Sequence, residues 1–148
     1  MSSYRQLIYH IIFRTKNSEK TLDVKHNIEL YKYIHGIIKN KHCKLYRING
    51  MEDHIHILTE VHPSIAIADF IRDIKTSTSF WLKQNDLFPY FNGWAEGYAA
   101  LSYTYRDKDM IISYIKNQQE HHKLLDFKNE LQIILEEHGI TVDPRFFP

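Results

Sequence analysis

The sequence predicts one α+β domain whose elements follow the order βαββαβ, with two further helices after them. Three observations support this order. Short segments rich in Ile and Tyr alternate apolar and polar residues, as half-buried strands do. The segments between them repeat apolar residues every three or four positions, as amphipathic helices do. Asn49-Gly50 favours a type I′ hairpin turn. A βαββαβ chain with a central hairpin has the ferredoxin-like pattern, an antiparallel sheet with helices on one face.

Three strands and one helix are expected in the first half of the chain. Residues 4–15 alternate and predict a long strand. A helix capped by Asp23 is expected to run to about Lys41. Its apolar face contains Val24, Ile28, Tyr31, Ile34 and Ile38. Residues 44–48 and about 52–61 then form the two strands of the hairpin.

The second half is expected to contain three helices and one strand. Pro63-Ser64 begins a helix that extends to about Gln84, and residues 85–97 form a loop. The apolar stripe of this helix consists of Ile67, Phe70, Ile71, Ile74, Thr78 and Trp81. Residues 98–105 predict the fourth strand. The last two helices span residues 107 to about 122, with Asp107 as cap, and 126 to about 137, with Asp126 as cap and Gly139 at the end.

The composition excludes several classes of protein. Lys and Arg number 19 and Asp and Glu 18, and this net charge of +1 argues against a protein that coats nucleic acid or binds membrane surfaces by charge alone. A single cysteine, Cys43, excludes an internal disulfide and a cysteine-based zinc site. No stretch approaches the roughly 20 apolar residues of a membrane span, and no secretory signal is visible. A cytoplasmic protein is expected.

The charge is unevenly distributed along the chain. Residues 126–148 carry −3, which leaves +4 on residues 1–125. We therefore expect one domain, with a modestly basic core over about residues 1–125 and an acidic C-terminal helix and tail over about 126–148. A charge of this size permits a few contacts with phosphate groups.

The segment His54-Ile55-His56 lies on the second strand of the hairpin. Residues two apart point to the same face of a strand, so His54 and His56 project together, roughly 7 Å apart at Cα. The other face, with Ile55 and Ile57, is the expected core face. Two imidazoles at this spacing can converge on one metal ion, and the alternative is two surface histidines on a half-exposed strand. A metal site would need a third ligand from elsewhere.

Tyr114 and Gln118 on the third predicted helix could complete such a site, because they are four residues apart and share one helix face. The alternative is that Tyr114 only packs, together with Ile111 and Ile115. His121 and His122 follow one turn later. They could compete as ligands or support them, but the preferred interpretation is a solvated helix end.

On these motifs the chain resembles the single-tyrosine HUH transposases of two-hundred-type insertion sequences and their REP-associated relatives. The resemblance covers almost the whole chain up to Gln118. The specific parts are Asn49-Gly50 with His54-Ile55-His56-Ile57-Leu58, and the helix with Tyr-Ile-x-Asn-Gln. The resemblance implies that His54 and His56 bind a divalent ion, Mg²⁺ or Mn²⁺. It also implies that Gln118 is the third ligand and Tyr114 the nucleophile.

The resemblance further implies a substrate, an intermediate and a partner. The substrate is single-stranded DNA, often at hairpins near the ends of the element, and cleavage leaves a 5′-phosphotyrosine and a free 3′-hydroxyl. The best-known members are homodimers in which the tyrosine helix of one subunit can complete the metal site of the other, whereas REP-associated relatives can act as monomers. Candidate DNA-contacting residues are Arg14, Lys16, Arg72, Lys75, Arg106 and Lys116.

Three other functions remain open at this stage. A histidine-triad hydrolase is the nearest, but Leu58 stands where its third histidine would be. A non-catalytic ferredoxin-like domain could bind nucleic acid while Tyr114 merely packs. A domesticated relative could recognise hairpin repeats without moving an element.

Overall fold

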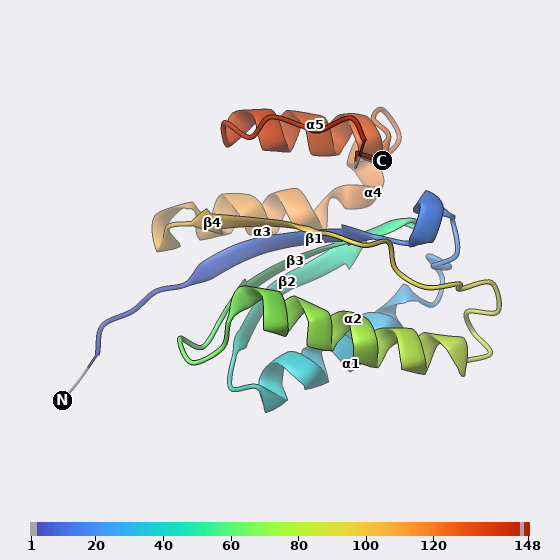
Figure 1. Ribbon diagram of the computed structural model, residues 1–148, viewed down its shortest axis with the longest axis horizontal. Helices are drawn as coiled ribbons and strands as arrows, with labels where there is room; N and C mark the ends of the chain where they lie inside the picture. Colours follow the sequence, from blue (N-terminus) through green and yellow to red (C-terminus); the bar gives the residue numbers. More distant parts are fainter. Residues whose placement is uncertain (1–2, 146) are drawn as a thin grey trace.

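The four strands form one antiparallel sheet in the order β2-β3-β1-β4 (Figure 1). A computed structural model describes residues 3–145 and 147–148. The strands are β1 (Ile8–Arg14), β2 (Lys44–Gly50), β3 (His54–Glu60) and β4 (Ala99–Tyr103). Because β1 pairs with both β3 and β4, it lies in the middle of the sheet. This topology confirms the predicted ferredoxin-like class.

The main core lies between one face of the sheet and two helices, α1 (Asn27–Asn40) and α2 (Ile67–Lys83). The sheet contributes Ile11, Phe13, Ile55 and Ile57, as the alternation of β3 predicts. The helices contribute Leu30, Ile34, Ile38, Phe70, Ile71 and Ile74. Burial of each aliphatic or aromatic side chain stabilises the fold by about 1.5–3 kcal/mol.

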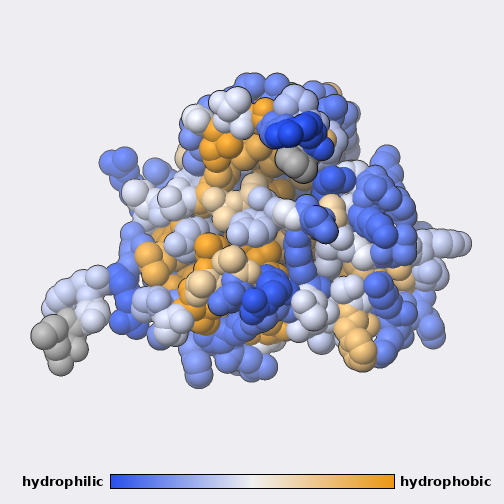
Figure 2. Space-filling model, viewed as in Figure 1, coloured by the Kyte–Doolittle hydropathy of each residue, from blue (hydrophilic) through white to orange (hydrophobic). Residues whose placement is uncertain are grey.

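The other face of the sheet is also covered, by α3 (Lys108–Lys116), α4 (Gln118–His121) and α5 (Phe127–Glu137). Ile111 and Ile115 of α3 pack against Ile8 and Leu58. Phe127, Leu131 and Ile134 of α5 pack against Ile12 and Leu101. Figure 2 shows apolar side chains gathered where α5 meets the sheet edge at β4. The even-numbered residues of β1 and β3 are therefore enclosed between the sheet and these C-terminal helices.

The helix boundaries differ from the sequence predictions in three places. α2 begins at Ile67 and not at Pro63-Ser64. α1 begins at Asn27, and Val24 and Ile28 are exposed while Leu30 is buried, so the buried stripe is rotated from the predicted one. The helix predicted over residues 107–122 is divided into a 3₁₀ turn, η2 (Tyr105–Asp107), α3 and α4. The break falls at Asn117, with ψ of 22°. Among the described residues, no helix combines the length and apolar character needed to cross a membrane.

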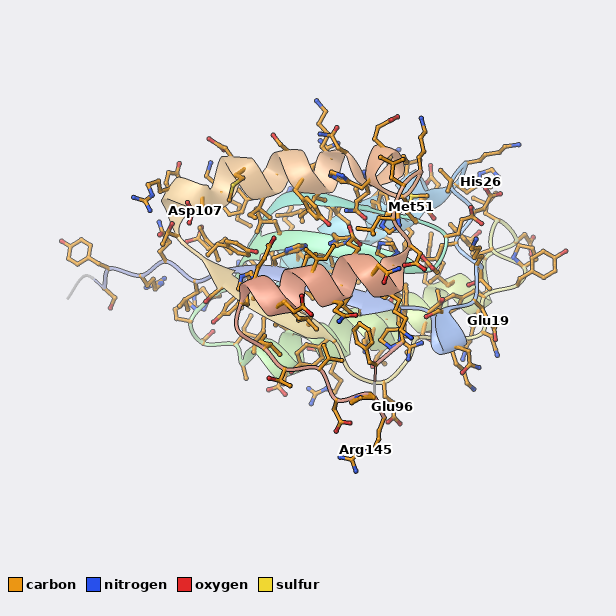
Figure 3. All side chains as sticks on the ribbon, turned by 90° about the horizontal axis from the view of Figure 1, so that it is seen from above. Glu19, His26, Met51, Glu96, Asp107 and Arg145 are labelled. Carbon is orange, nitrogen blue, oxygen red and sulfur yellow. The ribbon has the colours of Figure 1, made fainter. Side chains whose placement is uncertain are left out.

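The hairpin turn is also displaced from its predicted position. Asn49 and Gly50 belong to β2, opposite His56 and Ile55, and neither has the positive φ that a type I′ turn requires. The chain reverses instead at residues 51–53. The Asn49 amide donates hydrogen bonds to the carbonyls of Ile115 and Lys116 at 3.0 and 3.1 Å, so this residue fastens the end of α3 to the sheet. Figure 3 shows α3 running from Asp107 towards Met51 in the turn.

Gly50→Ala is expected to lower the free energy of unfolding by about 1–3 kcal/mol, as overpacking does. A Cβ at position 50 would lie 2.2 Å from the carbonyl oxygen of His54, a backbone atom that cannot rotate away. Urea denaturation monitored by circular dichroism measures the change. The matched control is Gly36→Ala inside α1, where nothing lies within 4 Å of the new Cβ; it should stabilise by about 0.5–1 kcal/mol. Equal stability of Gly50→Ala and wild type would contradict this packing.

Candidate metal centre and tyrosine

His54 and His56 are completely buried, each with 0% exposure. They point from β3 into the space enclosed by α3, α4 and α5, because residues of this face meet the C-terminal helices rather than solvent. The alternative of two surface histidines is therefore wrong. Their Nε2 atoms point towards a common neighbour, the carboxylate of Glu130 on α5, with Oε1 3.4 Å from His54 and 3.1 Å from His56.

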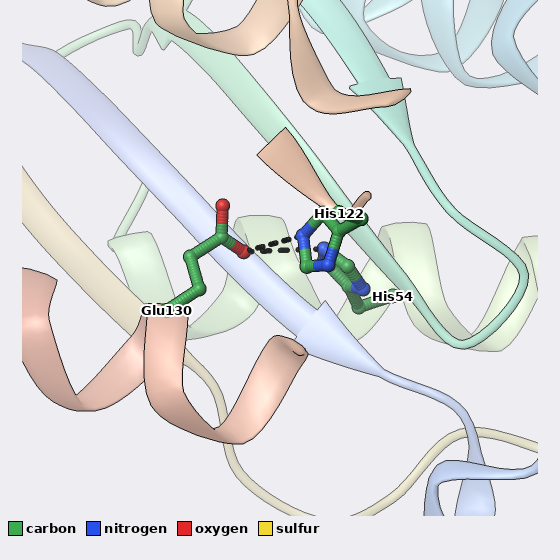
Figure 4. A group of neighbouring side chains, drawn as sticks. All are labelled: His54, His122 and Glu130. Carbon is green, nitrogen blue, oxygen red and sulfur yellow. Dashed lines mark hydrogen bonds and ion pairs between the residues drawn. The ribbon is translucent and has the colours of Figure 1, made fainter. Parts of the chain in front are cut away.

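Glu130 lies at the centre of the cluster and is only 2% exposed. Its Oε1 also lies 3.0 Å from Nε2 of His122, just after α4 (Figure 4). α5 positions this carboxylate because Phe127, Leu131 and Ile134 hold the same helix face against the sheet. Three imidazoles thus surround one carboxylate oxygen.

Tyr114 and Gln118 reach the second oxygen of the same carboxylate. The Tyr114 hydroxyl donates a hydrogen bond to Glu130 Oε2, and Gln118 Nε2 donates to the same atom at 2.9 Å. Gln118 Oε1 lies 3.2 Å from His54 Nε2, and the Gln118 side chain is fully buried. The structure therefore brings together all four residues predicted for the chemistry, His54, His56, Tyr114 and Gln118, although the predicted helix breaks between the last two.

His121 and His122 do not form a solvated helix end, so that preferred interpretation is wrong. His122 faces Glu130 and lies 4.7 Å from the His54 ring, centroid to centroid. His121 stacks on the Tyr114 ring at 4.7 Å with an interplanar angle of 26°. The break at Asn117 turns both rings towards the site instead of along a continuous helix face. The alternative in which they support or join the ligands is the one that this geometry favours.

Each of the two β3 histidines has its own partner at the other ring nitrogen. Nδ1 of His54 lies 2.7 Å from the Asp53 carboxylate. Nδ1 of His56 lies 2.8 Å from Nε2 of His10, a buried residue of β1. Such outer contacts fix the orientation and tautomer of a ligating imidazole.

The charges of the cluster depend strongly on burial. Burial opposes ionisation of Glu130, but hydrogen bonds from His122, His54 and His56 outweigh it and hold the pKa of this carboxyl far below its usual range. Burial lowers the pKa of His56 to about 4, whereas bonds to Asp53 and Glu130 outweigh burial and raise the pKa of His54. Burial and the Glu130 charge raise the pKa of Tyr114 well above its usual value. The cluster is therefore an anionic carboxylate with a neutral phenol.

The donor set fits a divalent metal ion. His54, His122 and Glu130 each offer one ligand atom, and these three atoms lie within 4.8 Å of one another. Two ligands about 2.1 Å from one ion, at tetrahedral or octahedral angles, are separated by about 3.0–3.4 Å. The three distances from Glu130 Oε1 to imidazole nitrogens, 3.0, 3.1 and 3.4 Å, agree with this range. A His/His/Glu metal site is thus available, and Gln118 Oε1 lies beside it.

Four of the predicted DNA-contacting residues lie near the ends of elements that border the site. Arg106 and Lys116 are exposed before and at the end of α3. Arg14 ends β1 opposite His54, and its guanidinium donates to Ser18 Oγ at 3.0 Å. Lys16 is exposed directly after it. Lys16, Arg106 and Lys116 are thus open to solvent and Arg14 only in part, and the geometry does not define a common surface.

The other two predicted residues, Arg72 and Lys75, lie on α2, in the layer on the opposite side of the sheet from the histidines. Arg72 lies 3.1 Å from the Asp69 carboxylate on the same helix. The Lys75 ammonium donates to the carbonyl of Ala95 at 3.0 Å and also to Gly97. Lys75 therefore holds the loop before β4, and the structure does not bring this pair to the histidine cluster.

The motif search missed two residues of the cluster, Glu130 and His10. Glu130 is one of five acidic residues in a segment expected to be an appended acidic tail. Its signal is an acid that shares the buried face of an amphipathic helix with Phe127, Leu131 and Ile134. For His10 the signal is a histidine inside the apolar run of β1.

Comparison with known proteins identifies the family of this chain. The family model described as "Transposase IS200 like" matches residues 3–118. The transposases of insertion sequence element IS200 from Salmonella typhimurium and Salmonella typhi are each 26% identical over 121 residues, which cover 78% of this chain and 79% of theirs.

Two solved structures have a similar fold. A candidate transposase from Deinococcus radiodurans R1 has a TM-score of 0.58 and 26% identity, covering 80% of this chain and 98% of that one. A REP-associated tyrosine transposase bound to a REP hairpin has a TM-score of 0.62 and 14% identity, covering 84% and 76%. The second likeness is one of fold alone. Since the family model spans most of the chain, including every predicted catalytic and metal-binding position, this protein belongs to the family of IS200-like transposases.

Proposed function

We propose that this protein cleaves and rejoins single-stranded DNA through a covalent bond between Tyr114 and a 5′-phosphate. The observation that carries the proposal is the convergence of the Tyr114 hydroxyl, two imidazoles of β3 and a carboxylate in one buried cluster. A phenol that only filled space would not need three imidazoles beside the carboxylate to which it is bonded.

In the proposed reaction the Tyr114 oxygen attacks the scissile phosphorus and the 3′-oxygen of the preceding nucleotide leaves. The bond from phosphorus to the 3′-oxygen breaks as the bond to the Tyr114 oxygen forms, and the phenol proton ends on the released 3′-hydroxyl. Glu130 Oε2 accepts the hydrogen bond of the phenol and so orients its oxygen. A phenol, with an ordinary pKa near 10, is a better leaving group than an alcohol, so a 3′-hydroxyl can reverse the step without ATP.

The residues proposed to hold the metal are His54, His56 and Gln118, as the family resemblance implies, together with Glu130. His122 lies beside them and forms the compact donor group with His54 and Glu130. A divalent ion bound there would neutralise charge on the scissile phosphate. A carboxylate suits both Mg²⁺ and Mn²⁺, whereas the imidazoles favour Mn²⁺. We propose Mn²⁺ or Mg²⁺ as the cofactor on this ground.

The proposed substrate is single-stranded DNA next to a hairpin. The solved relative bound to a REP hairpin shares this fold. The charge of +4 over residues 1–125 permits a few phosphate contacts, for which Arg14, Lys16, Arg106 and Lys116 are the better-placed candidates. Homodimerisation, as the family resemblance implies, stays part of the proposal.

The test is a cleavage assay with purified protein, Mn²⁺ and a labelled hairpin oligonucleotide that carries single-stranded flanks. The flanking DNA of the gene supplies the sequence of the hairpin. We expect a labelled protein band that survives denaturing electrophoresis, and EDTA should remove it. His56→Ala should abolish the band while hairpin binding persists. Binding of the hairpin with no adduct under either metal would favour the alternative, a non-catalytic protein that recognises hairpin repeats.

A further inference from the structure

We infer that His10 is a positioning residue that holds His56 in the tautomer that can bind a metal through Nε2. This inference rests on the metal site of the proposed function. It concerns a residue that contacts neither DNA nor the reacting phosphate in that proposal. His10 would act only through the His56 ring.

The position of His10 supports such a role. It lies on β1 with 1% exposure, on the same face as Ile8 and Ile12, and its Nε2 is 2.8 Å from His56 Nδ1. The two ring centroids are 5.0 Å apart. An imidazole placed among aliphatic side chains is unfavourable unless it is hydrogen-bonded, and this bond to His56 is the one that the described residues provide.

The chemistry of the ligand explains the need for an acceptor there. A neutral imidazole carries one proton, and the nitrogen that binds a metal carries none. Against the Glu130 carboxylate, which only accepts, His56 Nε2 carries a proton at a distance of 3.1 Å. A metal bound at Nε2 would displace that proton, and the proton of the neutral ring would then lie on Nδ1. His10 Nε2 is the acceptor within reach of that proton. For His54 the corresponding partner is Asp53, at 2.7 Å.

The other ring nitrogen of His10, Nδ1, bears on which nitrogen of this ring carries the proton. Nδ1 of His10 is buried and has no hydrogen-bond partner among the described residues. When Nε2 accepts from His56, neutral His10 carries its own proton on this Nδ1, and the bond to His56 must outweigh the cost of that unpaired N–H. A residue that merely filled space would need no nitrogen facing His56 at 2.8 Å.

Two substitutions separate positioning from packing. His10→Leu removes the acceptor but keeps an apolar side chain of similar size, whereas His10→Gln keeps an acceptor oxygen near the position of Nε2. Calorimetric titration with Mn²⁺, without DNA, measures the dissociation constant. We expect His10→Leu to weaken Mn²⁺ binding about 10–100-fold, as loss of an outer partner of a ligand does. His10→Gln should bind Mn²⁺ nearly as wild type does.

The matched control is Tyr103→Phe. The Tyr103 ring lies 6.2 Å from the His10 ring, and its hydroxyl has no hydrogen bond to the cluster among the described contacts. This variant changes the packing around His10 and should leave Mn²⁺ affinity unchanged. Wild-type affinity in His10→Leu would overturn the inference. Equal weakening in His10→Leu and His10→Gln would also overturn it, because it would show that only the size and shape of the imidazole matter.

A spectroscopic readout follows the tautomer directly. ¹⁵N shifts of labelled histidine distinguish a protonated Nδ1 from a protonated Nε2, and Zn²⁺ serves as a diamagnetic probe. We expect His56 to carry its proton on Nδ1 when Zn²⁺ is bound, and the coupling to His10 Nε2 to disappear in His10→Leu. A proton on His56 Nε2 in the presence of Zn²⁺ would refute the inference. Neither measurement uses Tyr114, so failure here is distinguishable from failure of the cleavage proposal.

Discussion

Tyr114→Phe is expected to abolish the covalent protein–DNA adduct completely while hairpin binding stays at the wild-type level. The variant lacks only the oxygen that would attack the phosphorus, and no other phenol hydroxyl among the described residues bonds to Glu130. Denaturing electrophoresis with labelled oligonucleotide measures the adduct. A gel shift without denaturant measures binding.

The fold should tolerate this substitution. The phenylalanine ring can keep the stacking on His121, and Glu130 Oε2 still accepts a hydrogen bond from Gln118 at 2.9 Å. Loss of one hydrogen bond should lower the free energy of unfolding by about 1 kcal/mol. Loss of the adduct would then reflect chemistry and not unfolding.

Tyr90→Phe provides the matched control, because this tyrosine is 79% exposed in the loop between α2 and β4, away from the cluster. It should form the adduct as wild type does. An undiminished adduct in Tyr114→Phe would show that another residue is the nucleophile. Loss of the adduct in both variants would point to a nonspecific effect of phenol removal.

A mixing experiment tests which subunit supplies the tyrosine. In the structure Tyr114 lies beside the histidines of its own chain, with its ring centroid 5.9 Å from that of His56. We therefore expect a mixture of Tyr114→Phe and His56→Ala proteins to remain inactive, because neither chain holds a complete site. Recovered activity in the mixture would instead demonstrate a tyrosine that acts across a dimer, as the family resemblance allows.

The sheet and the histidine pair could be predicted from sequence because their signals are local. β3 alternates from His54 to Ile57, and a period of two fixes which residues face α1 and α2, so the sequence predicts Ile55 and Ile57 in the core, as the structure confirms. The hairpin turn was misplaced because Asn49-Gly50 satisfies the turn rule locally, whereas tertiary contacts of the Asn49 amide with α3 fix it in the strand.

The rest of the cluster could not be predicted because it is assembled from distant segments. Glu130 is 74 residues from His56, and its segment appears in the sequence as an acidic amphipathic helix like many others. Local charge counting assigns such a residue to solvent. Only the packing of Phe127 and Leu131 on the sheet places the carboxylate inside.

Glu130→Gln should have the second large effect, on both stability and metal binding. The carboxylate accepts hydrogen bonds from Tyr114 and Gln118 and faces three imidazole nitrogens. An uncharged amide can accept only at its oxygen, and its NH₂ group would face other donors. Removal of one member of a buried charged cluster lowers the free energy of unfolding by about 3–5 kcal/mol. Urea denaturation in EDTA measures this loss, without any contribution from metal.

Glu136→Gln is the matched control, since Glu136 lies on the solvent side of the same helix, bonded to Gln132. A surface substitution of this kind should change stability by no more than about 0.5 kcal/mol. Wild-type stability of Glu130→Gln in EDTA would contradict the central position of Glu130 in the cluster.

The stabilisation of Glu130→Gln by Mn²⁺ shows whether Glu130 is a metal ligand or a carboxylate with a structural role alone. At a Mn²⁺ concentration about 100 times the wild-type dissociation constant, bound metal should stabilise the wild-type protein by about 2.7 kcal/mol. If loss of the only carboxylate ligand raises that constant about 100-fold, the variant gains only about 0.4 kcal/mol at the same concentration. An equal gain in both proteins would show that Glu130 organises the histidines without binding the ion. If Mn²⁺ raises the free energy of unfolding by this amount only in wild type and Glu136→Gln, Glu130 is a metal ligand. α5 then places that ligand beside the two histidines of β3.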